Sequence, residues 1–242
     1  MPTWFCLGIS LMTTPRSRSA WVAPLALFCG FVSMFQTTAV QAQDRPPVKP
    51  ADSDSPLAEG WPGGTAPDTI EVKRYPAYRS AVATAKEIPV NSGADGVLFM
   101  TLFNHISKND IAMTTPVVNT YDEVMIETPG EKGKMTMEFI YRTPRMGATG
   151  RDGAVEVKDH PATTYVALGV QGRMNTQIML NGVARLEKWL EENKGEWVAA
   201  GPPRRLGYHG PMTPESQKLW EVQIPIKSAK EVAPQPATAE KK

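Results

Sequence analysis

Cysteine is nearly absent from this sequence of 242 residues, and neither sign of charge is in excess. The only cysteines, Cys6 and Cys29, lie close to the N-terminus, so the rest of the chain can form neither a disulfide nor a cysteine-ligated metal site. Lys and Arg number 26 against 25 Asp and Glu, and this balance excludes the attraction to nucleic acid that a strongly basic protein has. The three histidines form no HxxxH or HExxH pair, so a dedicated zinc or di-metal site is not expected.

Long apolar runs are missing as well, apart from one near the N-terminus that has the features of an export signal. Ala20–Phe35 is apolar but too short for a permanent membrane anchor, and Arg16-Ser-Arg18 supplies the positive residues before it. Val40-Gln-Ala42 offers a small-x-small cleavage pattern, so residues 1–42 are predicted to be a Sec-type signal peptide. Met12 is an alternative start that would give the signal a more usual length. The expected location is the periplasm or the exterior, with no transmembrane anchor after the signal is removed.

Composition divides the remaining chain into one domain and two polar flanks. Residues 43–68 are rich in Pro, Gly, Asp and Ser and are predicted to be a disordered linker, in which Trp61 is an exception that can contact the domain. Residues 227–242, rich in Lys, Ala, Pro and Glu, are predicted to be a disordered tail. Residues 69–226 have the length of one ordinary domain.

Hydrophobic periodicity within this domain predicts strand, helix and strands, followed by the same order again. Helical spacing is found at Asp95–Ser107 and at Thr176–Glu192, each with one apolar stripe. The segments with strand-like patterns are Ile70–Thr84, Met113–Val118, Lys134–Tyr141, Val155–Val170, Glu196–Ala200, Arg205–Tyr208 and Leu219–Ile226.

The two halves of the domain begin with similar segments. Val72-Lys-Arg-Tyr-Pro-Ala77 and Val157-Lys-Asp-His-Pro-Ala162 share Val, Lys, Pro and Ala at equal spacing. This similarity indicates an internal duplication, and the alternative is coincidence between two strands interrupted by proline. Two β-α-β-β repeats predict an α+β fold, a distorted and mostly antiparallel β-barrel flanked by two helices. Such a curved sheet encloses or borders an apolar cleft.

The segment Ile111-Ala-Met-Thr-Thr-Pro-Val117 is an apolar strand pattern interrupted by proline, directly after the first predicted helix. Proline removes a hydrogen-bond donor from a strand, so the segment belongs at an edge, a bulge or the rim of a pocket. Apolar side chains at such a rim are available for binding.

Three ordered motifs resemble those of the SOUL haem-binding family. They are Ile70-Glu-Val-Lys-Arg-Tyr-Pro-Ala77, Asp110-Ile-Ala-Met-Thr-Thr-Pro-Val117, and Gly207-Tyr-His-Gly-Pro211 followed by Leu219-Trp-Glu-Val-Gln-Ile224. The resemblance covers nearly all of residues 69–226. It implies a distorted β-barrel with two helices, related to gyrase-inhibitor-like effector-binding domains. The implied activity is non-catalytic binding of haem or another tetrapyrrole, for transport or scavenging.

Haem requires an apolar slot, cations for its propionates and, optionally, an axial ligand for its iron. Five apolar residues of the first predicted helix and the rim segment are expected to line the slot: Phe99, Leu102, Phe103, Met113 and Val117. The alternative role of each is simple core packing. Arg205 is the cation expected to meet a propionate, and Arg204 and Lys108 are further candidates. Their alternative role is solvated surface charge.

His209 is the best-placed candidate for an iron ligand, because it lies in the Gly207–Pro211 loop at the predicted rim. His105 lies near the end of the first helix, and His160 precedes a proline in a strand entry. The sequence also departs from the family pattern at two positions. A histidine proposed as the haem ligand in one branch of the family falls on Arg74, and a basic residue used on the first helix in another branch falls on Phe99.

Two other functions stay open. One is an effector-binding-type module for another small apolar or cationic ligand. The other is a hydrolase that uses Glu138 or Glu221 as an inward general base, although such residues more often form the solvent-facing half of an alternating strand. There is no GxSxG motif, no nucleophilic cysteine and no P-loop, so the chain is not expected to be an enzyme.

Overall fold

The computed structural model describes residues 55–232, whose ten strands join into one sheet. The pairings between these strands are antiparallel. The strands are β1 (Ile70–Tyr75), β2 (Tyr78–Ile88), β3 (Val117–Tyr121), β4 (Gly133–Ile140), β5 (Gly150–Asp152), β6 (Val155–His160), β7 (Thr163–Gln171), β8 (Trp197–Ala199), β9 (Arg204–Gly207) and β10 (Leu219–Ser228). The helices are α1 (Asp95–Lys108), α2 (Glu123–Glu127), α3 (Thr176–Glu192), α4 (Ala229–Val232) and a short 3₁₀ helix at Glu215–Gln217.

The order of the strands is symmetrical about the centre of the sheet. β3 and β9 pair in the middle, and outward from them the order is β4, β2 and β6 on one side and β10, β7 and β1 on the other. Each half of the chain therefore gives its first strand to the other half, since β1 pairs with β7 and β6 pairs with β2. This arrangement agrees with the duplication that the sequence predicts. β5 and β8 are additions to it.

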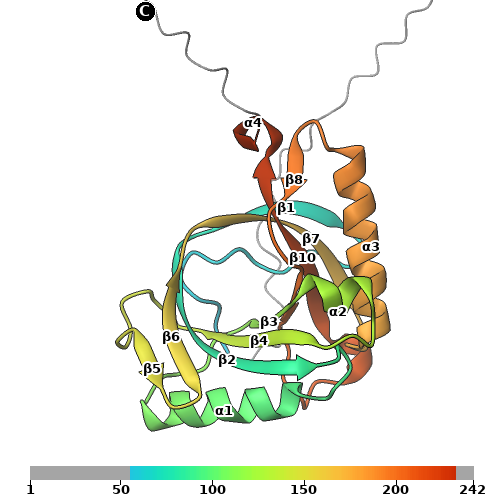
Figure 1. Ribbon diagram of the computed structural model, residues 1–242. Helices are drawn as coiled ribbons and strands as arrows, with labels where there is room; N and C mark the ends of the chain where they lie inside the picture. The colour runs from blue at the N-terminus through green and yellow to red at the C-terminus, as the bar shows by residue number, and fades with distance from the viewer. Residues whose placement is uncertain (1–54, 233–242) are drawn as a thin grey trace, which may run out of the picture. The chain divides into compact units, whose positions relative to one another are not determined.

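The predicted α+β class is confirmed, but closure of the sheet into a barrel is not. The sheet curves strongly around the cyan N-terminal segment in Figure 1. Its outer strands, β1 and β5, do not pair with each other anywhere in the part of the chain that the structure describes. The fold is therefore a curved, open antiparallel sheet.

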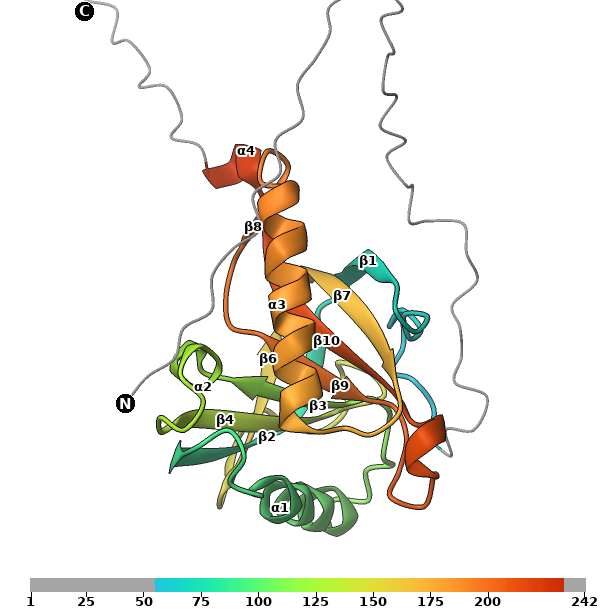
Figure 2. The ribbon, with the colours of Figure 1, turned by 90° about the vertical axis from the view of Figure 1, so that its right-hand side faces the viewer.

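Two amphipathic helices cover one face of the sheet, which we call the outer face. α1 contacts β2, β4 and β6, whereas α3 contacts β7, β8 and β10 (Figures 1 and 2). The buried stripe of α1 includes Leu98, Leu102 and Ile106, and Asn175 caps α3 by accepting a hydrogen bond from the Ile178 N–H at 2.8 Å. Each helix covers the strands on one side of the sheet, and the central β3–β9 pair lies between them.

The opposite, inner face is covered by residues 55–69, which we call the strap. The sequence predicts a disordered linker at residues 43–68, and this prediction is wrong for residues 55–68. Trp61 is buried against Tyr75 and Tyr78, with ring centroids 4.8 and 5.1 Å apart. The Glu59 N–H donates to the Arg142 carbonyl at 3.0 Å. A few apolar residues with satisfied backbone groups are enough to order a segment whose composition is polar.

A glycine in the sheet allows the strap to lie directly on it. Asp68 N–H donates to the Gly169 carbonyl at 2.9 Å, and Pro67 forms a bridge with the same residue. A methyl group on Gly169 would meet the carbonyl oxygens of Thr65 and Ala66 well inside contact distance. The strap backbone therefore occupies the space that a side chain would take.

The strap also explains why polar side chains are buried on the inner face. The alternation predicted for Lys134–Tyr141 places Glu138 on a polar face, yet Glu138 is only 7% exposed. Its Oε2 accepts a hydrogen bond from the Ser80 hydroxyl at 3.0 Å and lies 3.3 Å from His160 Nε2. The ring of His160 stacks on Tyr78 at 4.4 Å. The end of β4 is therefore buried on both faces, one beneath α1 and the other against Tyr78, on which Trp61 of the strap packs.

Several predicted boundaries shift in the structure. The rim strand begins at Val117 and not at Met113, because the residues before it form an irregular extended segment. The predicted tail starts too early at residue 227, since β10 runs to Ser228 and α4 follows it. Residues 1–54, including the predicted signal peptide, and 233–242 lie outside the described residues. Within residues 55–232, no helix has both the length and the apolar character needed to span a bilayer.

Replacing Gly169 with Ala tests the contact between strap and sheet. Because the added methyl group would meet backbone and not a flexible side chain, we expect the free energy of unfolding to fall by about 1–3 kcal/mol. Urea denaturation measures this change, and hydrogen exchange of residues 55–69 should increase. Gly195→Ala is the matched control, since no atom lies within 4 Å of its added methyl group. Equal effects of the two substitutions would contradict the assigned role of Gly169.

The buried position of His160 predicts a pH dependence of stability. Burial lowers the pKa of His160 from its usual value of 6.5, an effect that nearby Glu138 only partly offsets. Below that value the unfolded chain binds a proton that the folded chain resists, so this contribution to stability is present above pH 6.5 and is lost as the pH falls. Urea denaturation from pH 7.5 downward should show a smaller loss for His160→Gln than for the unsubstituted protein. Identical profiles would rule out this contribution.

Candidate functional site

A cleft opens on the outer face over the central strands, between the beginnings of α1 and α3. Its volume is about 390 Å³. Its apolar wall is formed by Phe99, Met113, Val117, Met137 and Met174. Its polar wall is formed by Ser55, Asp95, Thr114, Thr115, Asn119, Arg205, Tyr208, His209 and Lys218, with Gly96, Gly207, Gly210 and Pro211 completing the lining.

The rim segment is held in place by its two threonines. The Thr114 hydroxyl donates to the Ile140 carbonyl, and the Thr115 hydroxyl donates to the Tyr208 carbonyl at 3.0 Å. The Thr115 N–H donates to the Pro56 carbonyl at 3.0 Å, so the strap supports the rim as well. With the threonines anchored to backbone, Met113 and Val117 on either side of them line the cleft.

Arg205 reaches the cleft from β9 and is held by an ion pair. Its Nη2 lies 2.8 Å from Asp95 Oδ1, which also accepts a hydrogen bond from Asn119 Nδ2 at 2.7 Å. Its guanidinium carbon lies 5.9 Å from the centre of the Tyr121 ring. Burial raises the pKa of Tyr121 to about 12, with Arg205 lowering it and Asp95 raising it. This phenol therefore stays neutral at physiological pH.

His209 lines the cleft, but its hydrogen bonds do not suit an iron ligand. The Leu219 N–H donates to His209 Nδ1 at 2.9 Å. The Leu219 carbonyl lies 3.5 Å from the same nitrogen, so the shorter contact with the N–H favours the neutral tautomer with its proton on Nε2, where no lone pair is free. The sequence predicts His209 as a metal ligand, whereas this geometry favours a side chain that donates a hydrogen bond. The described residues hold no group of three or more His, Cys, Asp or Glu that could bind a metal ion.

The structure brings five of the seven predicted site residues together in this cleft: Phe99, Met113, Val117, Arg205 and His209. The other two lie elsewhere on α1. Leu102 is fully buried in the core beneath the helix. Phe103 is 41% exposed and stacks on Phe99, with ring centroids 6.1 Å apart, but it does not line the cleft. The helical period alone does not distinguish the residues that face the sheet from those that border the cleft.

The remaining candidates also have other partners. Arg204 lies on the inner face, with its guanidinium 3.5 Å from the centre of the Tyr165 ring. Lys108 lies 3.4 Å from Asp152 at the other end of α1. His105 bridges Asp152 and the Tyr141 hydroxyl, each at 3.0 Å. None of the three lines the cleft.

Sequence reasoning missed several residues of the cleft, among them Asp95, Asn119, Met137, Met174 and Lys218. Asp95 looks like an ordinary acidic residue in the first turn of a helix, and Met137 looks like an ordinary core residue. Met174 lies in a loop before α3 and carries no pattern of its own. No local sequence signal marks these residues. In the structure Gly207 lies opposite Val117, and the Met174 side chain lies 3.5 Å from the position that a Cβ on Gly207 would take.

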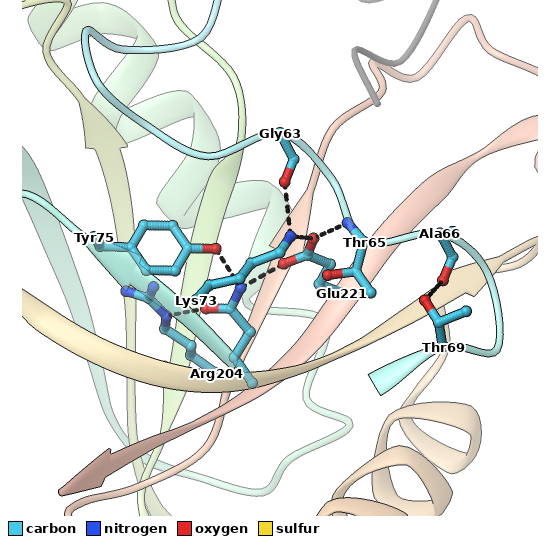
Figure 3. Close-up of polar contacts among 9 residues, drawn as sticks. Gly63, Thr65, Ala66, Thr69, Lys73, Tyr75, Arg204 and Glu221 are labelled. Carbon is cyan, nitrogen blue, oxygen red and sulfur yellow. Dashed lines mark hydrogen bonds and ion pairs between the residues drawn. The ribbon is translucent and has the colours of Figure 1, made fainter. Parts of the chain in front are cut away.

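The inner face holds a second polar cluster, in which Lys73 and Glu221 form a buried ion pair beside the strap (Figure 3). Lys73 Nζ lies 2.6 Å from Glu221 Oε1 and donates to the Gly63 carbonyl of the strap at 2.7 Å. The Thr65 N–H donates to the same Glu221 carboxylate. Gln223 links this group to Arg204, whose Nε donates to it at 2.9 Å.

Glu138 and Glu221 are therefore both inward, contrary to the solvent-facing role that the sequence favours. Neither is available to a substrate. Glu221 is fully buried with three donors on its carboxylate, from Lys73, Thr65 and Gln223. A carboxylate already paired with a cation gains little from a second one, so the cluster is poorly suited to a cationic ligand or a general base.

The residues of the outer cleft fit the apolar faces of a tetrapyrrole. Its volume lies in the lower part of the range for small-molecule sites, which is roughly 300–1,000 Å³. Phe99, Val117 and Met137 offer an aromatic and aliphatic wall, and Arg205 offers a cation. The hydrogen bonding of His209 does not supply a poised imidazole ligand.

Several solved structures of low sequence identity are similar to this chain. An uncharacterized conserved protein from Listeria innocua matches with a TM-score of 0.50 and 10% identity, over 66% of this chain and 93% of that chain. The C-terminal domain of EcmrR matches with a TM-score of 0.49 and 17% identity, over 66% and 97%. A hydrolase from Listeria innocua matches with a TM-score of 0.47 and 11% identity, over 67% and 94%. No curated protein matches the sequence.

The family model described as "SOUL heme-binding protein" matches residues 64–225. The match spans both halves of the sheet, both long helices and the residues of the cleft from Asp95 to Lys218. It confirms the resemblance that the three sequence motifs indicate. The chain belongs to the SOUL heme-binding protein family.

Proposed function

We propose that the protein binds haem or another tetrapyrrole in the outer cleft and carries it without chemical change. The observation that supports this most directly is the convergence of Phe99, Met113, Val117, Arg205 and His209 on one cleft. These residues come from α1, the rim segment, β9 and the loop after it, and the fold alone brings them together. Family membership makes a tetrapyrrole the first ligand to test.

The side chains of the cleft have separable roles in this proposal. The macrocycle lies against Phe99, Val117 and the methionine side chains, which adapt to its shape and replace water at its faces. His209 Nε2–H donates a hydrogen bond to an acceptor on the ligand. Bound haem would supply redox-active iron, and the cleft residues hold the ring without a histidine ligand.

The proposed role is transport or scavenging outside the cytoplasm. The apolar run and cleavage pattern of residues 1–42 support export by a Sec-type signal, to the periplasm or beyond. The burial of Glu138 and Glu221, and the ion pair of Glu221 with Lys73, argue against the alternatives, a cationic effector or a hydrolytic reaction. The balanced charge of the chain gives no support to nucleic-acid binding.

Haem titration of the purified protein tests the proposed function. Binding at micromolar haem should shift the Soret band, and Phe99→Ser should weaken affinity at least about tenfold because it removes the aromatic wall. Phe103→Ser is the matched control on the same helix and should change affinity by about twofold or less, since Phe103 does not line the cleft. No Soret shift at micromolar haem, or equal losses in the two variants, would overturn this assignment.

The hydrogen bonding of His209 generates a separate prediction about iron ligation. Because Nδ1 accepts the Leu219 N–H, His209→Ala should leave the Soret maximum of the haem-loaded protein unchanged. Its affinity should fall modestly through the loss of one donor. Absorption and electron paramagnetic resonance spectra of the two loaded proteins provide the measurement. A displaced Soret maximum, with a changed spin state, would show that His209 ligates the iron after all.

A further inference from the structure

The two cationic side chains that line the cleft are both paired with carboxylates of the chain itself. Arg205 Nη2 lies 2.8 Å from Asp95 Oδ1, and Lys218 Nζ forms an ion pair with Glu215. The side chains of Arg205 and Lys218 are only 13% and 12% exposed, so solvent screens these cations weakly. A ligand that enters the cleft therefore meets cations whose charge is already balanced.

Asp95 is held beside Arg205 by its surroundings. The buried Asn119 side chain donates to the same oxygen of Asp95, Oδ1, at 2.7 Å. Asp95 is also the first residue of α1, where the positive end of the helix dipole stabilises a carboxylate. Asp95 is nevertheless 46% exposed and lines the cleft. Any ligand group that reaches Arg205 must therefore also meet the carboxylate of Asp95.

We propose that Asp95 determines the charge of the ligand that this cleft accepts. A ligand carboxylate that approaches Arg205 must either displace Asp95 from its ion pair or lie beside a like charge, and both cost binding free energy. An uncharged apolar ring meets no such penalty. The preferred ligand is thus an apolar ring compound with no anionic group at the Arg205 end. This inference rests on the proposed function for its ligand class, because it concerns the same cleft.

The test compares ligands that differ only in charge, against Asp95→Asn. One pair is haem and its dimethyl ester, followed by absorbance. The second pair is anilinonaphthalene sulfonate and the uncharged N-phenylnaphthylamine, followed by fluorescence. Asparagine keeps the shape of the side chain and its acceptor oxygen. We expect it to tighten binding of each anionic ligand roughly tenfold and to change binding of each uncharged ligand by about twofold or less.

Two further variants test whether the effect depends on Asp95 and its partner Arg205. Glu187→Gln removes one negative charge from the exposed side of α3 and should leave every affinity unchanged. In an Arg205→Gln background, Asp95→Asn should still favour the anionic ligands, because it removes an unpaired carboxylate that repels them. The affinities of these ligands should nevertheless stay below those of the Asp95→Asn protein, because the Arg205 cation is absent. Equal gains for charged and uncharged ligands would instead mean a change in the shape of the cleft and would overturn the inference.

The two ligand pairs also separate this inference from the proposed function. If neither macrocycle binds any of the proteins while Asp95→Asn shifts the dye preference toward the sulfonate, tetrapyrrole binding fails and the role of Asp95 stands. If haem binds the unsubstituted protein and Asp95→Asn leaves the relative affinities within both ligand pairs unchanged, the role of Asp95 is wrong and tetrapyrrole binding stands. Failure of all four compounds to bind would overturn both.

Discussion

The contact of the strap with the inner face of the sheet is the interaction on which the rest of the structure depends. A curved sheet of this size has two faces to bury, and the two long helices cover only one of them. The strap covers the other with Trp61, and its backbone lies against Gly169 and bonds to Glu221 and Lys73. Because that face is filled by the chain itself, the cleft lies on the outer face instead.

The position of the cleft on the outer face follows from the symmetry of the sheet. α1 covers β2, β4 and β6 on one side of the sheet, and α3 covers β7, β8 and β10 on the other, so the central pair of β3 and β9 is left between them. Gly207 lies opposite Val117 in that pair and places no side chain over the sheet. The rim segment and the loop after β9 then form walls around an opening that the duplicated architecture creates. A site at this position draws on both halves, which explains why its residues are scattered through the sequence.

Elements with a strong period were predictable from the sequence, whereas burial beneath a non-periodic segment was not. The helix Thr176–Glu192 has the predicted bounds, because its apolar stripe and its Asn175 cap are both local signals. The sequence predicts disorder for residues 55–68, because a segment that binds a sheet through backbone hydrogen bonds needs no periodic pattern of apolar side chains. The misplacement of Glu138 follows from the same error, since the strap buries the face that the alternating pattern assigned to solvent.

In the cleft, the sequence predicts the apolar residues better than it predicts the charge interactions. Its apolar residues were largely predictable, because Met113 and Val117 flank a proline and Phe99 precedes them on a helix. Its charges were not, because an ion pair is a property of two residues that the fold brings together, and Arg205 and Asp95 are 110 residues apart. Read singly, Arg205 is a free cation that attracts a propionate; beside Asp95 it is half of a neutral pair. The sign of the electrostatic contribution to ligand binding therefore depends on tertiary structure, even where the residue that carries the charge is visible in the sequence.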